Sequence, residues 1–247
     1  MPKDRPVTED GTNGDYITLT GAESYTDVCW GAPFKSINVT SGDRLTYSLT
    51  TGFDNTGTGE TPTHQISKAI GPTTEAINMV MFHMMSDVTI QLTTSTGDDA
   101  VDLTNATVQL TNIHPTGKVL MGNGLVSPTE TPTDVSGTVD NNHKWHYGFV
   151  PQSLTDVNGT TNDVVLTITT TDKNRYIVDM KEVVASTYSN TLIANPYTAS
   201  SNKITRWYPN SKYTYTFHLL KTGVSKITAS LANWESVTAD SQDVYIQ

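Results

Sequence analysis

The chain has 247 residues, of which 36% are hydrophobic and 16% charged, and its formal net charge is −10. This negative charge argues against a nucleic-acid partner, which requires a basic surface. No run of about 18 consecutive apolar residues occurs, so the sequence holds no candidate transmembrane helix. About one residue in six is threonine, valine, isoleucine and tyrosine are plentiful, and the strong helix formers are sparse. The composition therefore predicts an all-β protein.

Strands are expected where apolar residues alternate between turn signals. The first 70 residues supply about three or four short strands. These are too few to form an independent sandwich of the same size as the one expected from the rest of the chain. From Ile77 the pattern changes, and residues 77–92 are predicted to form one long strand, because apolar residues alternate over 80–84 and again, on the same parity, over 88–92. We therefore expect a small N-terminal β domain, residues 1–74, followed by a larger C-terminal β-sandwich domain, residues 75–247.

Hairpins dominate the second part of the chain. Residues 105–121, 164–178 and 213–231 each consist of two alternating segments joined by a turn signal, so each is predicted to form a hairpin. Residues 144–150 form a further strand that ends at a proline. About seven strands at this spacing fit a β-sandwich with Greek-key connections.

Few residues are arranged for chemistry. Cys29 is the single cysteine, so no disulfide can form within the chain, and we expect it to be a small buried hydrophobe beside Trp30. On a strand, His143 and His146 would point to opposite faces, whereas a metal ion needs ligands that converge. No nucleophile elbow and no glycine-rich phosphate loop occurs. The sequence therefore predicts no catalytic residue, no metal site and no cofactor.

Aromatic side chains outside the strands are candidates for stacking on sugar rings. Trp207 and Tyr208 lie in a loop that precedes a predicted strand, and we expect both to be partly exposed there. They are the candidate ligand-binding aromatics of the chain. The alternative is that they fill the core of a sandwich or a domain junction.

Five motifs, taken in order, resemble the fimbrillin family of Bacteroidetes, which comprises subunits of surface fimbriae and related lipoproteins. They span about residues 75–237, and they are INMVMFHMMSDVTIQL, VQLTNIHPTGKV, HYGFVPQSL, DVVLTITTTDKNRYIVDM and SKYTYTFHLLKTGVSKITASLANWESV. The first 70 residues depart from the family, because they are shorter than its usual N-terminal domain and no lipobox leader precedes them. The resemblance implies two transthyretin-like β-sandwich domains and no enzymatic activity. It also implies an extracellular location, in a fimbrium or anchored at the outer membrane.

The resemblance further implies assembly with other fimbrial subunits, identical or different, by β-strand addition. A sheet that lacks one strand exposes unpaired backbone groups and an apolar trough, which an incoming strand fills. The candidate donor strand is the C-terminal tail, in which Val244 and Ile246 are spaced to face one side. The candidate donor residues are Val237, Val244, Tyr245 and Ile246. The alternative is that this tail forms the last strand of its own sheet.

A second hypothesis concerns the protein as a whole. It could instead be a monomeric cell-surface lipoprotein that binds a glycan or a host protein through its exposed aromatics. A chain of this composition also suits a viral surface protein.

Overall fold

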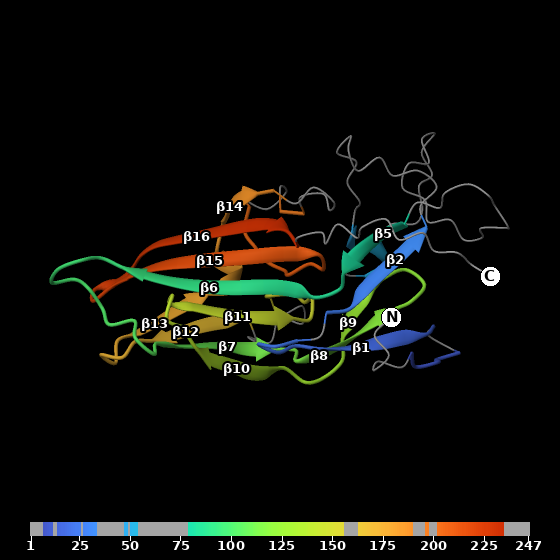
Figure 1. Cartoon of the computed structure of the whole chain (residues 1–247), viewed down its shortest axis with the longest axis horizontal. Helices are drawn as coiled ribbons and strands as arrows, with labels where there is room; N and C mark the ends of the chain where they lie inside the picture. The colour runs from blue at the N-terminus through green and yellow to red at the C-terminus, as the bar shows by residue number, and fades with distance from the viewer. Residues whose placement is uncertain are drawn as a thin grey trace.

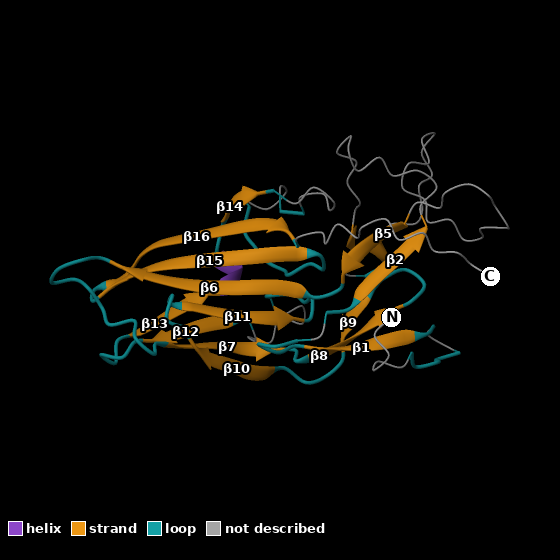
Figure 2. Cartoon of the chain, in the orientation of Figure 1, coloured by secondary structure: helices purple, strands orange, loops and turns teal. Residues whose placement is uncertain are grey.

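The computed structural model describes residues 7–11, 14–25, 27–33, 47–48, 50–53, 79–155, 163–189, 196–197 and 202–234. Within these residues the protein is all-β, which confirms the prediction from composition: the strands form five sheets, and helical structure occurs in the 3-10 helix η2 (Met180–Glu182). Figure 2 shows how strands make up nearly all of the regular structure. In this described part of the chain, no helix combines the length and the apolar character that crossing a membrane requires.

The largest sheet has five strands and contains one of the predicted hairpins. In spatial order its strands are β11 (Lys144–Phe149), β6 (Ser86–Thr94), β15 (Ser211–Leu220), β16 (Gly223–Asn233) and β14 (Ala185–Tyr188). β15 and β16 pair antiparallel, which confirms the hairpin predicted for residues 213–231. β6 pairs with β15, and β14 with β16, in parallel. Along β15, Tyr213, Tyr215 and Phe217 are buried and alternate with half-buried residues, because successive side chains of a strand point to opposite faces.

A four-stranded antiparallel sheet forms a second layer. In spatial order its strands are β10 (Thr133–Thr138), β7 (Thr107–Ile113), β12 (Val165–Thr169) and β13 (Arg175–Asp179). β12 and β13 form the hairpin predicted for residues 164–178. Figure 1 shows the two large sheets running along the long axis of the molecule. Both sheets contribute side chains to one buried apolar core, including Val88, Ile90 and Leu92 from the first sheet and Leu110 and Leu166 from the second.

Three smaller sheets gather at one end of the molecule (Figure 1). Their strands are β1 (Tyr16–Thr20), β8 (Thr116–Leu120) and β9 (Val126–Pro128) in one sheet, β2 (Cys29–Pro33) and β5 (Met79–His83) in another, and β3 (Tyr47–Ser48) and β4 (Gly52–Phe53) in the third. Phe53 packs between Trp30 and Phe82, with ring centroids 5.2 and 4.3 Å away. Strands from both sides of residue 74 therefore pair and pack together. The division of the chain at residue 74 stays a prediction.

Two strand predictions are wrong. Residues 77–92 do not form one strand: β5 ends at His83, β6 begins at Ser86, and the two strands belong to different sheets. Met84 and Met85, between them, are both fully buried, so the chain passes through the core where it changes sheets. The alternation of apolar residues continues across this break, and alternation alone does not reveal a change of partner.

The predicted hairpin over residues 105–121 is also absent. β7 pairs with β10 and β12, whereas β8 pairs with β1 and β9, so the segment between them links two sheets. The side chain of Gln152 accepts a hydrogen bond from the backbone N–H of His114 (2.9 Å) and donates one to its carbonyl (3.3 Å). A buried side-chain amide thus satisfies the backbone groups that a hairpin turn would have paired.

Candidate functional site

The outer edge of β16 is covered along only part of its length. β14 pairs with β16 at Ala229, Ser230 and Leu231, and no other described strand pairs with that edge. Along Gly223–Thr228 the outward backbone groups therefore have no strand partner among the described residues. Ile227, in this stretch, is 38% exposed. An open strand edge beside an exposed apolar side chain is a template to which another strand can add.

The four-stranded sheet has open edges at β10 and at β13 within the described residues. β13 pairs with β12 on one side only, within the part of the chain that the structure describes. Ile177, at its centre, is 63% exposed, the largest value among the exposed large hydrophobic residues. Arg175 beside it is also exposed, and a charged residue on an edge strand discourages indiscriminate pairing.

The edge at β11 is partly covered. Ala22 and Gly148 exchange backbone hydrogen bonds of 3.1 and 2.9 Å, so the segment before β2 lies along this edge. The ring of Tyr25 lies directly over Gly148, where an added Cβ would come within 2.2 Å of the ring. Trp145 also donates a hydrogen bond to Glu23 (2.6 Å). These contacts cover the edge of β11 around Gly148 and Trp145.

Trp234, the last residue that the structure describes, packs beside the small sheets. Its ring is stacked on that of His83, with centroids 4.8 Å apart and planes 12° apart. The ring of Tyr25 meets it edge-on at 5.7 Å. Trp234 therefore lies beside β5, at the end of the molecule where the small sheets gather.

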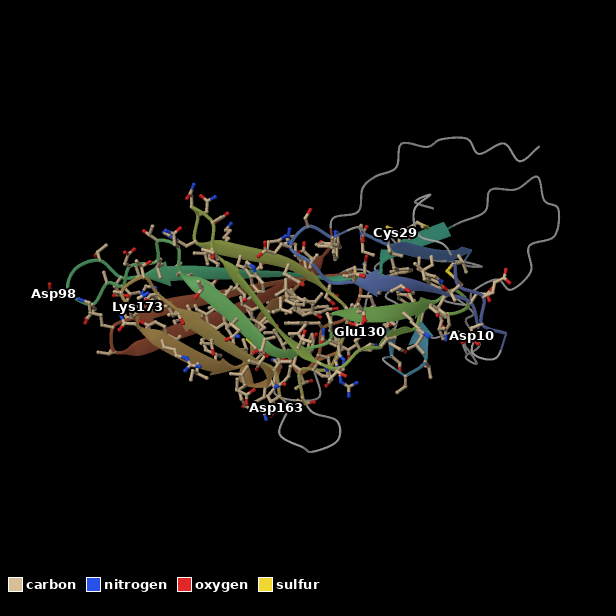
Figure 3. The ribbon with its side chains drawn as sticks, turned by 90° about the horizontal axis from the view of Figure 1, so that it is seen from below. Asp10, Cys29, Asp98, Glu130, Asp163 and Lys173 are labelled. Atoms are coloured by element: carbon tan, nitrogen blue, oxygen red, sulfur yellow. The ribbon has the colours of Figure 1, made fainter. Side chains whose placement is uncertain are left out.

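Three polar side chains converge next to Trp234. Nδ1 of His83 lies 2.6 Å from Oδ2 of Asp27. Sγ of Cys29 lies 3.3 Å from the same oxygen and 3.7 Å from Nδ1 of His83. β2 and β5 cause this convergence, because their register places Cys29 directly opposite His83. Figure 3 shows Cys29 on the β2 ribbon, far from Asp98 and Lys173 at the other end of the molecule.

The three side chains also alter one another's acidity. Partial burial would raise the pKa of the Asp27 carboxyl, but the hydrogen bond and the charge of His83 outweigh it and hold that pKa below its usual value. Partial burial of its sulfur, together with the neighbouring Asp27 carboxylate, raises the pKa of the Cys29 thiol to about 12. Cys29 is therefore a thiol rather than a thiolate at neutral pH, although the residue is exposed.

Comparison with known proteins identifies the family. The profile described as fimbrillin-like matches residues 66–234, more than half of the chain. The chain belongs to the fimbrillin-like family. Fimbrillin-like proteins are typically non-catalytic proteins of fimbriae and the cell surface, and the resemblance seen in the sequence is thereby confirmed. No curated protein sequence matches the chain.

Several solved structures resemble this fimbrillin-like chain at low sequence identity. A candidate cell adhesion protein of Bacteroides uniformis is 18% identical, with a TM-score of 0.46 over 64% of this chain and 53% of that one. The tip fimbrial protein Mfa3 of Porphyromonas gingivalis, truncated at its C-terminus, is 13% identical, with a TM-score of 0.43 over 62% and 52%. A candidate cell adhesion protein of Bacteroides ovatus is 12% identical, with a TM-score of 0.42 over 94% and 75%. The matched regions thus cover about half of the first two proteins.

The expected exposure of Trp207 and Tyr208 is wrong. Trp207 is 0% exposed and Tyr208 is 9% exposed, because the segment that holds them folds into the core instead of forming a surface loop. Backbone hydrogen bonds between Trp207 and Gln152 hold this segment, and the indole N–H of Trp207 donates to the hydroxyl of Tyr215 (2.9 Å). The ring of Trp207 also stacks on Phe149, 4.6 Å away. Neither residue is available for stacking on a sugar.

The expectation for Cys29 is wrong as well. Cys29 is exposed, whereas its neighbour Trp30 is buried, because the two alternate on a strand with one covered face. Sequence reasoning missed Asp27 and His83 as its neighbours. The only local signal was the spacing of Asp27 and Cys29, two residues apart, because His83 joins them through strand pairing alone. The candidate donor residues Val237, Val244, Tyr245 and Ile246 lie outside the described residues.

Proposed function

We propose that this chain is a non-catalytic fimbrial subunit, or a fimbrillin-like surface protein, that assembles by β-strand addition and acts in cell adhesion. The observation that carries the proposal is the open edge of β16 at Gly223–Thr228 in a chain of the fimbrillin-like family. The expected partners are other fimbrial subunits, identical or different. No enzymatic activity and no cofactor forms part of the proposal.

The edge at β16 suits an added strand for a physical reason. Each outward backbone group along Gly223–Thr228 can pair with an extended segment, and the exposed side chain of Ile227 offers apolar surface to the same segment. Burial of such surface contributes about 25 cal/mol for each Å² removed from water. The main-chain pairs align the incoming strand, and the apolar contacts set its register.

The donor in this proposal is the C-terminal segment, residues 237–247, of a second copy or a different subunit. Val244 and Ile246 would point to the core-facing side of the extended sheet, and Tyr245 would point to its other face, because side chains alternate along a strand. The arrangement is heterologous: the donor and the acceptor are different surfaces of the same chain. Heterologous contacts that do not close into a ring produce open polymers.

The finer architecture and location also belong to the proposal. We propose two transthyretin-like β-sandwich domains with Greek-key connections, a small one comprising residues 1–74 and a larger one comprising residues 75–247. The two large sheets over one shared core are consistent with the larger sandwich. The proposed location is extracellular, in a fimbrium or anchored at the outer membrane, which follows from the family.

Deletion of residues 237–247 tests the proposal. The full chain is expected to form fibres or ladder-like oligomers, seen by size-exclusion chromatography and negative-stain microscopy. The truncated chain is expected to stay soluble and monomeric, with an unchanged far-ultraviolet circular dichroism spectrum. A truncated chain that unfolds or aggregates would instead mean that the tail belongs to its own core, and one that still polymerises would exclude the tail as donor.

Substitutions of single residues make this test sharper. V244D together with I246D places charges on the proposed inner face of the donor, so oligomers are expected to disappear. Y245D places a charge on the outer face and is the matched control, with oligomers expected to persist. I227K is expected to act on the acceptor, whereas I177K alters the edge of β13 and serves as its control. Equal effects of the inner-face and outer-face substitutions would contradict strand insertion.

The alternative function, a monomeric lipoprotein that binds glycans through exposed aromatics, is not favoured. Trp207 and Tyr208, its candidate residues, are buried. A discrete monomer that binds on a glycan array would nevertheless support it over strand addition.

A further inference from the structure

Asp27, Cys29 and His83 carry the three side-chain donor types found in zinc sites. Zinc in proteins is bound by thiolate sulfur, imidazole nitrogen and carboxylate oxygen. Within the described part of the chain, these three residues form the group of such side chains whose ligand atoms all lie within 4.8 Å of one another. Because the sulfur ligand favours a borderline-soft metal, calcium and magnesium are poor candidates.

The sheet builds this convergence from its regular geometry. Cys29 and His83 are direct partners in the antiparallel pair of β2 and β5, so their side chains leave the sheet on the same face. Asp27 precedes Cys29 by two residues and reaches the same point. Trp234 stacks on the imidazole of His83 and limits its rotation. Strand pairing and aromatic packing therefore hold Cys29 and His83, and Asp27 lies in the segment directly before β2.

The distances between the donor atoms are close to those of a tetrahedral zinc site. With bonds of about 2.3 Å to sulfur and about 2.0 Å to nitrogen and oxygen, tetrahedral angles place sulfur about 3.5 Å from each of the other two atoms. The structure has 3.3 Å from Sγ to Oδ2 of Asp27 and 3.7 Å from Sγ to Nδ1 of His83. Nδ1 and Oδ2 are 2.6 Å apart, in hydrogen-bond contact, and they would separate to about 3.3 Å around the ion.

The second carboxylate oxygen of Asp27 also favours a cation near this group. The other oxygen of Asp27, Oδ1, is buried and accepts no hydrogen bond of ordinary geometry from the residues that the structure describes. A buried carboxylate oxygen without a donor is unfavourable, and a nearby cation would compensate for it. Cys29 lies at the surface, so an ion can reach the group from solvent.

We propose that Asp27, Cys29 and His83 form a zinc-binding site beside β2, β5 and Trp234. Cys29 binds through Sγ, His83 through Nδ1 and Asp27 through Oδ2. On binding, the Sγ–H bond of Cys29 and the Nδ1–H bond of His83 break and both protons are released to solvent, while the remaining imidazole proton stays on Nε2 of His83. Three protein ligands leave the fourth tetrahedral position to water or to a donor from another chain.

Titration of the full chain with zinc in competition with a chromogenic chelator tests the site. One zinc ion per chain is expected, and C29S and H83Q are each expected to weaken binding at least ten-fold. H146Q is the matched control. Nε2 of His146 lies 2.5 Å from Oδ1 of Asp87, so these two residues form a second histidine–aspartate pair, but one without a thiol. Zinc binding that is unchanged in C29S, or lost equally in H146Q, would overturn the proposal.

A second measurement needs no variant and therefore does not depend on whether C29S folds. X-ray absorption at the zinc edge of the loaded wild-type chain is expected to show one sulfur neighbour at about 2.3 Å with nitrogen or oxygen in the remaining positions. Replacement of zinc by cobalt(II) is expected to give a thiolate-to-metal charge-transfer band. A coordination shell of oxygen alone would assign the ion to surface carboxylates and would contradict the site.

Discussion

Replacement of Trp207 distinguishes a core tryptophan from a ligand-binding one. Its indole is fully buried, stacks on Phe149 at 4.6 Å and donates a hydrogen bond to Tyr215, which is also fully buried. Replacing such a side chain by alanine costs about 3–5 kcal/mol, through lost burial and the cavity that remains. W207L keeps part of the volume, so we expect a loss of about 3 kcal/mol in the free energy of unfolding.

Two milder variants separate the hydrogen bond from the packing. W207F keeps a ring to stack on Phe149 but leaves the hydroxyl of Tyr215 without its donor, and Y215F leaves the indole N–H without its acceptor. A buried polar group without a partner costs about 1–3 kcal/mol. The double variant W207F/Y215F removes both the donor and the acceptor. Its loss of unfolding free energy is therefore expected to be smaller than the sum of the losses in the two single variants.

Urea unfolding followed by far-ultraviolet circular dichroism measures these free energies, and a glycan array run in parallel measures binding. We expect the free energy of unfolding to fall in W207L, W207F and Y215F. The signal on the glycan array is expected to equal that of the wild type in each of them. A change below about 1 kcal/mol in W207L, accompanied by loss of binding to a glycan, would refute the placement of Trp207 in the core.

Three further predictions concern Gly148, Cys29 and Asp27. In G148A the added methyl group would lie 2.2 Å from the ring of Tyr25, so the free energy of unfolding is expected to fall by about 1–3 kcal/mol. G122A is the control: no atom of the described residues other than its chain neighbours lies within 4 Å of the added methyl group, so no change in the free energy of unfolding is expected. Because the pKa of the Cys29 thiol is raised to about 12, iodoacetamide at pH 8 is expected to alkylate the folded chain about thirty-fold more slowly than the urea-unfolded chain, and equal rates would contradict the raised pKa. The lowered pKa of Asp27 stabilises the fold above the ordinary carboxyl value of 3.8, and this contribution is lost as the pH falls through the folded-state pKa. D27N should therefore be less stable than the wild type near pH 7, by at most about 1 kcal/mol, and the difference in unfolding free energy should vanish in acid.

Local pattern accounts for the parts of the fold that the sequence predicts correctly. The β12–β13 and β15–β16 hairpins join strands that are neighbours in the chain, so alternation and a turn signal suffice to identify them. The hairpin expected around His114 fails because the partners of β8 are β1 and β9, and the former lies about a hundred residues earlier in the chain. No local signal encodes such a pairing.

The predictions for the candidate site residues also depend on pairing between distant segments of the chain. The segment around Trp207 is polar and rich in turn formers, yet its pairing with Gln152 draws it into the core. Cys29 and His83 are 54 residues apart and meet only because β2 and β5 pair in one particular register. The sequence predicts which side chains of a strand share a face. The residues that those side chains contact depend on the register in which distant strands pair.

The structure of the assembled polymer, determined by electron cryo-microscopy, tests strand addition most directly. We predict that residues 237–247 of one copy run along the edge of β16 in the next, with Val244 and Ile246 on the core-facing side of the extended sheet. A polymer in which these residues pair only within their own copy, or in which Gly223–Thr228 stays unpaired, would contradict the account.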